Sequence, residues 1–137
     1  MKVILDKNAI MPQKAHKTDA GFDLFSREKK TVPAGGSAIY DTGVHIQLPN
    51  GTVGMLKSKS GLNVKHGITS EGVIDAGYTG SIIVKLYNDS DTDYIVERGD
   101  KITQLVILPL AYVGELEITD HFEETERGTG CLGSSGK

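Results

Sequence analysis

The sequence is poor in residues that cross-link or stiffen small proteins: it has one cysteine, four prolines, no tryptophan and only 6% aromatic residues. The single Cys131 excludes a framework of internal disulfides and supplies no cysteine cluster for a metal ion. No apolar run approaches the roughly 20 residues that span a membrane as a helix. Residues 1–6 include charged side chains and no cleavage-site pattern, so we expect a cytoplasmic protein without membrane contact.

The chain has the length and composition of one compact globular domain. It contains 137 residues, of which 38% are hydrophobic and 24% charged. Its net charge of −3 hides an asymmetry, because residues 1–65 hold ten Lys and Arg against five Asp and Glu, and residues 66–137 hold five against thirteen. Charges of +5 and −8 are compatible with phosphate binding, with attraction between the halves, or with ordinary surface patterning.

Glycine, in contrast, is abundant, at 17 of 137 residues, and falls between short apolar runs. Apolar and polar residues alternate over residues 44–48 and again over 53–55. The intervening Asn50-Gly51 is typical of a β-hairpin turn, because both residue types tolerate positive φ. Further strands are predicted over residues 82–87, 94–96 and 105–108, the last with both faces buried.

Helical periodicity is weak throughout the sequence. The best candidate is one short helical turn after Ser60, whose side chain is suited to cap it. Short strands joined by turns predict an all-β fold, an antiparallel jelly-roll-like barrel or sandwich. We expect residues 1–122 to form this single domain and the polar, Gly/Ser-rich residues 123–137 to form a flexible C-terminal arm.

Five segments combine glycine with charged or hydroxyl side chains. Glycines let main-chain N–H groups approach an anion closely, and Lys, Arg and Ser supply further donors, so two of the segments look suited to phosphate. Neither glycine-rich stretch has the spacing of a Walker loop or of a dinucleotide-binding turn. The segments are residues 18–24, 57–62, 72–80, 98–104 and 127–136.

Taken together and in order, these segments resemble the five ordered motifs of the trimeric dUTPases. The resemblance implies a jelly-roll homotrimer with shared active sites, in which the arm closes over a neighbouring subunit's site. It implies hydrolysis of dUTP to dUMP and pyrophosphate by water attack on the α-phosphorus, with Mg²⁺. This reaction limits uracil incorporation into DNA and supplies dUMP for thymidylate synthesis, and it requires no direct nucleic-acid binding.

The resemblance gives three polar residues catalytic roles. Asp75 matches the aspartate that orients and deprotonates the attacking water, a task that a carboxylate within hydrogen-bond reach can perform. Asp23 and Gln104 match residues near the α-phosphate and the waters of Mg²⁺. The ion itself is bound mainly by the phosphates and water, so these two residues are expected as outer-shell contacts only.

The same resemblance places the nucleoside on the segment of residues 72–80. Tyr78 matches the residue whose ring packs under the deoxyribose and leaves no room for a 2′-hydroxyl. Uracil is held largely by main-chain groups, which implicates Gly72, Ile74 and, across the hairpin, Ile83. Such a pattern rejects cytosine, because its mismatched polar groups stay unpaired.

Lys59, Ser60 and Gly61 match the phosphate-binding segment of the family, in which an arginine usually stands at the position of Lys59. A lysine keeps the positive charge but loses the planar, bidentate fork of an arginine. Ser60 and the start of the short helix are expected to offer further donors to the phosphates.

The last segment matches the family's C-terminal arm. Arg127 is expected to contact the terminal phosphate, and Gly133 and Ser134 to donate hydrogen bonds. Cys131 and Leu132 stand where the family usually has Gly-Phe, and a leucine can cover the base but cannot stack on it. Weaker capture of the substrate is therefore expected.

Three alternative functions fit part of the sequence. A dCTP deaminase shares the fold and part of the hairpin, but it lacks the arm that begins at Arg127. A non-catalytic trimer that binds a regulatory protein has no need of Asp75, Tyr78 and Gln104, although these residues are compatible with a second, binding role. A structural jelly-roll protein would have no need of all five segments.

Overall fold

The computed structural model describes residues 1–131, which form ten strands and one short helix. Leu132, Gly133 and Ser134, for which we predict contacts with substrate, lie outside the described residues. The elements are β1 (Lys2–Leu5), β2 (Gly21–Phe25), β3 (Lys30–Val32), β4 (Ser37–Asp41), β5 (Val44–Gln47), β6 (Thr52–Lys57), α1 (Ser60–His66), β7 (Ile68–Asp75), β8 (Ile83–Asn88), β9 (Tyr94–Val96) and β10 (Lys101–Pro109).

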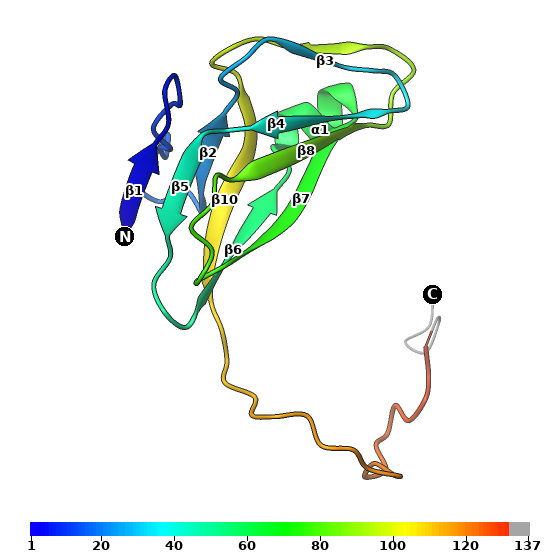
Figure 1. The fold of residues 1–137 in the computed structure, drawn as a ribbon. Helices are drawn as coiled ribbons and strands as arrows, with labels where there is room; N and C mark the ends of the chain where they lie inside the picture. The colour runs from blue at the N-terminus through cyan, green and yellow to red at the C-terminus, as the bar shows by residue number, and fades with distance from the viewer. Residues whose placement is uncertain (132–137) are drawn as a thin grey trace.

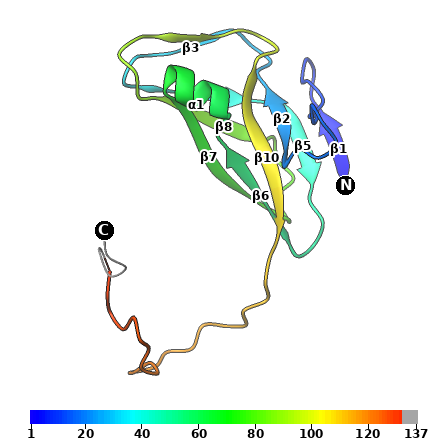
Figure 2. The same cartoon turned by 180° about the vertical axis from the view of Figure 1, so that it is seen from behind.

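One curled sheet dominates the molecule (Figure 1). Its six strands lie in the order β2-β10-β6-β7-β8-β4, and the pairs β1-β5 and β3-β9 form two smaller sheets. Neighbouring strands are antiparallel in every recorded pair. Seen from behind, α1 lies beside the end of the large sheet at which β6 and β7 are joined (Figure 2). The predicted all-β, antiparallel fold class is confirmed.

The core is built from alternate residues of paired strands. Ala38 lies opposite Leu86, and Tyr40 lies opposite Val84, and all four side chains are buried. Such directly opposed pairs stabilise a sheet, and burial of each large aliphatic side chain contributes roughly 1.5–3 kcal/mol. Other fully buried side chains are Leu24, Val32, Val44, Leu56, Ile68, Ile82, Val96, Ile102 and Leu105.

The prediction of a β-hairpin around Asn50-Gly51 is wrong. A turn does occur there, with Gly51 at φ 73°, but Asn50 is not at positive φ. The flanking strands do not pair with each other, since β5 pairs with β1 and β6 pairs with β10 and β7. The turn therefore carries the chain from one sheet to another, which local turn chemistry alone does not reveal.

Strand β10 is buried less completely than the apolar run 105–108 suggests. Leu105 is fully buried, but Leu108 is 46% exposed. The strand lies between β2 and β6 over its first part, and only β6 accompanies it beyond Val106. The end of β10 therefore has fewer neighbours than a central strand.

The helix expected after Ser60 is present and has seven residues, about one turn more than expected. Lys59 occupies the N-cap position, and no side chain caps the helix, so Ser60 is the first helical residue and not the cap. Gly67, in the left-handed conformation at φ 65°, ends the helix, and its N–H donates to the carbonyl of Asn63. Leu62 packs against the core and fixes the helix to the sheet.

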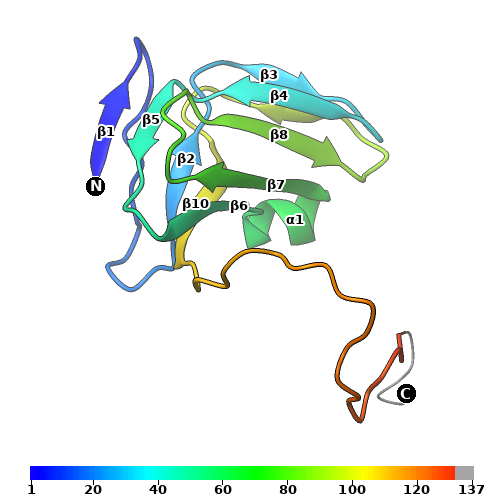
Figure 3. The same cartoon turned by 60° about the horizontal axis from the view of Figure 1, so that its bottom comes forward.

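After β10 the chain leaves the sheets (Figure 3). Residues 110–131 form no strand or helix, so residues 111–122, which we expected within the domain, lie outside the sheets. This stretch exposes several large apolar side chains almost completely. They are Tyr112, Val113, Leu116, Ile118 and Phe122. No helix in the described part of the chain is long and apolar enough to span a membrane.

Candidate functional site

Two lysines contact the buried carboxylate of Asp23, which lies in the middle of β2. Lys59 approaches Oδ1 from the N-cap of α1, and the Lys101 Nζ lies 2.8 Å from Oδ2. The Asp23 side chain is only 6% exposed, whereas those of Lys59 and Lys101 are 28% and 43% exposed. The cluster therefore presents positive charge to solvent above a fixed negative centre.

The electrostatics of this cluster keep Asp23 ionised. Burial alone raises the pKa of Asp23, but hydrogen bonds from Lys101 and Lys59 and their positive charges outweigh that effect and lower it. A carboxylate held in this way orients both ammonium groups. The two ammonium groups together carry one more charge than the carboxylate neutralises, so the cluster is suited to bind an anion.

Gln104 lies directly opposite Asp23 on the neighbouring strand β10. Its Nε2 donates to the carbonyl of Ser58 at 3.2 Å, which leaves Oε1 available to accept a hydrogen bond. A β-carbon added at Gly21 comes within 3.0 Å of that Oε1, so glycine at this position leaves room for the Gln104 side chain. The structure therefore brings Asp23, Lys59 and Gln104 together.

Buried hydroxyl groups support this cluster from behind. The Oγ atoms of Ser70 and Thr103 lie 2.7 Å apart, and Thr103 also donates to the carbonyl of Lys57. Ser58 donates to the carbonyl of Ser70 and accepts from its N–H. These bonds tie β6, β7 and β10 together immediately behind the lysines.

Ser60 and Gly61 begin α1 and are exposed. A β-carbon added at Gly61 meets no atom of this chain within 4 Å. Packing within one chain therefore does not require glycine at this position.

Asp75 and Tyr78 lie on the connection between β7 and β8. Asp75 is the last residue of β7 and is exposed, and its carbonyl accepts from the N–H of Tyr78 at 3.0 Å. The Tyr78 hydroxyl donates to the carbonyl of Ser81 at 2.9 Å, and the side chain is 43% exposed. The connection thus forms a closed loop that presents one carboxylate and one aromatic ring.

Strands β7 and β8 are paired only at the end away from this loop. Their recorded partners run from Ile68 opposite Asn88 to Ser70 opposite Leu86. Beyond Ser70, β7 pairs with β6 on its other edge, up to Asp75 opposite Val53. The facing edges of β7 and β8 therefore diverge toward the loop and leave main-chain groups between them free to bind a planar, polar ligand.

The predicted uracil contacts surround this opening. Gly72 lies in β7, where an added β-carbon comes within 3.0 Å of the Leu56 side chain. Ile74 is buried, and Ile83, the first residue of β8, is 47% exposed. All three residues border the diverging part of the hairpin.

Asp75 lies away from the row of residues that holds Asp23 and Gln104, whereas Gly72 lies next to that row. Asp23, Gln104, Lys57 and Glu71 are successive partners in one row across β2, β10, β6 and β7. Asp75 lies four residues further along β7 than Glu71, a distance of about 13 Å along a strand. A single chain therefore does not bring Asp75 to Asp23 and Lys59.

Arg127 lies in the stretch outside the sheets, where its Nε donates to the carbonyl of Gly130 at 3.1 Å. Among the described residues, no recorded contact joins Arg127 to the residues around Asp23 or to the loop that holds Asp75. Its predicted contact with the terminal phosphate stays a prediction.

Sequence reasoning missed two polar contacts of the site. Lys101 belongs to the segment of residues 98–104, but its pairing with Asp23 depends on the register between β2 and β10, which is irregular between Lys101 and Thr103. His45 is a polar residue within the alternating segment 44–48, yet its ring contacts the carbonyl of Thr79 in the β7–β8 loop. No local signal in the sequence indicated either contact.

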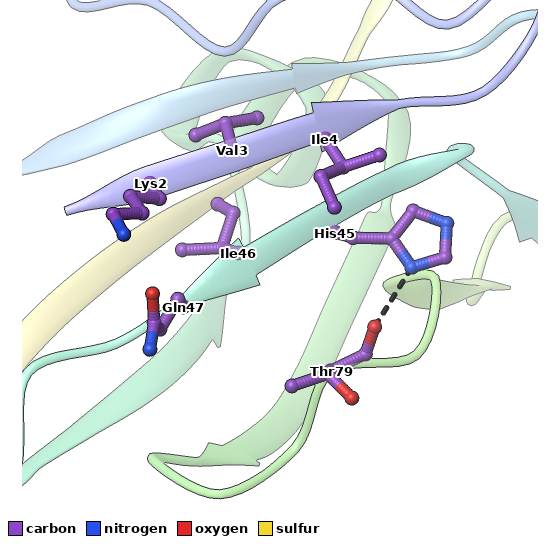
Figure 4. Close-up of a pocket in the computed structure, with 7 residues that line it drawn as sticks. All are labelled: Lys2, Val3, Ile4, His45, Ile46, Gln47 and Thr79. Atoms are coloured by element: carbon purple, nitrogen blue, oxygen red, sulfur yellow. Dashed lines mark hydrogen bonds between the residues drawn. The ribbon is translucent and has the colours of Figure 1, made fainter.

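A groove of about 500 Å³ lies between β1, β5 and this loop (Figure 4). Three apolar side chains of the two strands, Val3, Ile4 and Ile46, contribute to its lining. It meets the candidate site only at Thr79. The lining residues are Lys2, Val3, Ile4, His45, Ile46, Gln47 and Thr79.

The fold and the site define a nucleotide-binding β protein, and comparisons with known proteins identify its family. The dUTPase family profile matches residues 7–136. The chain is 42% identical to the deoxyuridine 5'-triphosphate nucleotidohydrolase of Clostridium tetani over 137 residues, covering 98% of this chain and 94% of that protein. It is 39% identical to the enzyme of that name from Kluyveromyces lactis, covering 95% and 88%.

Solved structures give the same result. The dUTPase of Staphylococcus bacteriophage 80alpha with dUpNHpp superposes with a TM-score of 0.91 at 35% identity, covering 99% of this chain and 98% of that chain. A mutant dUTPase from phage phi11 of S. aureus, described with a structural Mg(II) ion, superposes with a TM-score of 0.80 at 33% identity, covering 90% and 98%. The chain belongs to the dUTPase family.

Proposed function

We propose that this dUTPase family member hydrolyses dUTP to dUMP and pyrophosphate with the residue roles described below. As a family member it is a dUTP diphosphatase. The observation that carries the residue assignment is the hairpin of β7 and β8, which presents diverging main-chain edges, an exposed carboxylate and an aromatic ring within one loop. Uracil, water and deoxyribose each find a suitable group there.

Asp75 acts as the general base for the attacking water. It is exposed at the end of β7, and the ladder between β6 and β7 holds its main chain in place. A positioned carboxylate accepts the hydrogen bond of water and takes up its proton as the oxygen attacks phosphorus. The bond from that oxygen to the α-phosphorus forms while the bond to the bridging oxygen of the leaving pyrophosphate breaks.

The hairpin recognises the nucleoside. Main-chain groups on the diverging edges of β7 and β8, around Gly72, Ile74 and Ile83, pair with the polar edge of uracil. The ring of Tyr78 lies against the deoxyribose and excludes a 2′-hydroxyl. Cytosine presents the opposite donor pattern and leaves buried groups unpaired, which is costly.

Lys59 and Lys101 bind the phosphates, with Ser60 and Gly61 beside them. Asp23 holds both ammonium groups in place, and both remain partly exposed. They can therefore attract a triphosphate while keeping their positions. Since Asp23 accepts from both lysines, its direct coordination of a metal competes with two cations.

The residues fit Mg²⁺ only as outer-shell contacts. Among the described residues there is no group of three or more His, Cys, Asp or Glu side chains that could hold a metal. The Oε1 of Gln104 and the carboxylate of Asp23 are suited to accept hydrogen bonds from metal-bound water. When bound to the phosphates, Mg²⁺ neutralises their charge, and we expect chelation by EDTA to lower kcat/KM at least about tenfold.

The complete active site is shared between subunits of a homotrimer. One chain keeps Asp75 about 13 Å along β7 from the row that holds Asp23 and Gln104, so a second copy supplies the missing group. The exposed apolar residues of the stretch 110–122 are suited to cover a neighbouring subunit. The arm that begins at Arg127 then closes over the phosphates.

Two measurements test this proposal. Pyrophosphate release from dUTP with Mg²⁺ is compared between the parent and Asp75→Asn, with UTP, dCTP and dTTP as further substrates. We expect selective cleavage of dUTP and a loss of about 1,000-fold or more in kcat for the variant. Near-parental kcat in Asp75→Asn excludes Asp75 as the base.

Subunit mixing tests the shared site. The variants Asp75→Asn and Gln104→Ala are each expected to be nearly inactive, but refolding them together forms mixed trimers in which some sites have both parental residues. Recovered activity supports a site built from different chains. Activity no higher than the sum of the separate variants indicates that each chain builds its own site.

A further inference from the structure

His45 connects strand β5 to the loop that carries Tyr78. Its Nδ1 lies 2.8 Å from the carbonyl oxygen of Thr79, a contact visible in Figure 4, and its Nε2 lies 3.3 Å from Oδ1 of Asp6. A carbonyl and an ionised carboxylate only accept hydrogen bonds. Both contacts are therefore hydrogen bonds at the same time only when both ring nitrogens carry hydrogen, which makes the ring a cation.

The charged surroundings of His45 favour this cation. Asp6 follows β1 and Asp41 ends β4, while Arg27, between β2 and β3, contacts both carboxylates at 3.7 and 2.5 Å. Lys2 lines the same groove from β1. The bond to Thr79 raises the pKa of His45 most, partial desolvation opposes it, and Asp6 and then Asp41 raise it further.

The sign of the pH dependence follows from this raised pKa. The two hydrogen bonds are present together at pH values below the ordinary pKa of 6.5, and one of them is lost as the pH rises through the higher pKa of the folded protein. Loss of the proton places a ring lone pair against either the carbonyl of Thr79 or the carboxylate of Asp6. One of the two contacts then has to break. Because an ionised carboxylate is a stronger acceptor than a carbonyl, the neutral ring keeps its hydrogen toward Asp6 and releases Thr79.

The rest of the loop is held at other points. Asp41 accepts from the Ser81 hydroxyl, the carbonyl of Ile82 accepts from the Thr42 hydroxyl, and the N–H of Ile82 donates to Val44. These bonds fix residues 81 and 82. Among the recorded contacts between this loop and the β4–β5 region, the bond from His45 is the one nearest in sequence to Tyr78.

We propose that His45 is a positioning residue, whose protonated ring fixes the carbonyl of Thr79 and thereby the ring of Tyr78 at the sugar. The inference rests on the proposed role of Tyr78 in nucleotide binding. Asp75 is held separately by the ladder between β6 and β7. Loss of the His45 proton therefore weakens nucleotide binding and leaves the chemical step in place.

The test measures KM and kcat for dUTP between about pH 5.5 and about pH 9, a range that spans the titration of histidine. It compares the parent with His45→Asn, Asp6→Asn and the control His16→Asn, in which an exposed histidine is replaced. An asparagine keeps a neutral donor near the position of Nδ1 and does not titrate. NMR titration of the ring of His45 in the parent and in Asp6→Asn gives its pKa directly.

We expect the KM of the parent to rise about fivefold across this range, the effect of losing one exposed hydrogen bond, with kcat unaffected by the same titration. His45→Asn is expected to lack this rise. Its KM should keep only the pH dependence that the phosphates of dUTP cause. Asp6→Asn is expected to move the rise in KM and the NMR pKa of His45 to lower pH. His16→Asn is expected to behave as the parent.

The proposal is overturned if His45→Asn shows the same rise in KM as the parent, or if Asp6→Asn leaves the pKa of His45 unchanged. If His45→Asn does not fold, Asp6→Asn and the NMR titration decide alone. Failure of the underlying site assignment is distinguishable, because Tyr78→Ala then leaves the KM for dUTP unchanged whatever the titration of His45 shows.

Discussion

Gly80 lies against the ring of Tyr78 so closely that a β-carbon at this glycine would come within 2.4 Å of the phenolic oxygen. The glycine therefore determines where the tyrosine ring lies. Gly77, in the same loop, has no atom within 4 Å of the corresponding position. The two glycines form a matched pair for testing the role of the ring.

We expect Gly80→Ala to displace the ring of Tyr78 and to raise the KM for dUTP about tenfold, since a misplaced binding group costs on the order of 1.4 kcal/mol. Discrimination against UTP should fall as well. Steady-state kinetics with both nucleotides measures the effect, and Gly77→Ala serves as the control. Equal behaviour of the two variants contradicts the assigned role of the ring.

The ion pairs of Asp23 predict a pH-dependent stability. Because the pKa of Asp23 is lowered, its contribution is complete above its ordinary value of 3.8 and is lost as the pH falls through the lower folded value. We expect Asp23→Asn to lower the free energy of unfolding by about 2 kcal/mol near neutral pH. Urea unfolding at fixed protein concentration measures it, and the difference from the parent should shrink as the pH falls from about 6 to about 2.

The control for this prediction is Glu71→Gln, which removes the exposed partner of Lys57. An exposed pair contributes little, and we expect a change below about 1 kcal/mol. If the free energies of unfolding of Asp23→Asn and the parent differ by the same amount at every pH, the ionised carboxylate of Asp23 is not the source of the difference.

Lys59→Arg is expected to lower the KM for dUTP about threefold, because a guanidinium offers two parallel donors to a phosphate where an ammonium offers a point charge. Lys57→Arg is the control. Lys57 bonds to Glu71 on the exposed surface, at 2.8 and 2.9 Å. If Lys59→Arg leaves KM unchanged or raises it, the position of Lys59 does not favour a bidentate contact.

Deletion of residues 127–137 is expected to lower kcat/KM for dUTP about 100-fold, since an open site admits water and loses contacts to the phosphates. Arg127→Ala should account for about tenfold of this loss. Cys131→Ser, within the same segment, should have no effect. A truncated protein with parental kinetics shows that the arm does not take part in the reaction.

Much of the fold and of the site is determined locally. The strand at β8, the glycine-rich turns and the order of the five segments are readable from the sequence, and burial alternates along β8 because side chains of a strand point to opposite faces in turn. The residues of the loop that holds Asp75 and Tyr78 are contiguous, so their proximity needs no tertiary information.

Only the tertiary structure decided which segments meet. The turn at Asn50-Gly51 looked like a hairpin, yet β5 and β6 pair with other strands, because pairing depends on partners remote in sequence. Lys101 reaches Asp23 through an irregular register, and His45 reaches Thr79 across 34 residues. Register also separates Asp75 from the lysines. Strand pairing over long sequence distances, and not local residue preference, therefore determines which of the predicted site residues one chain brings together.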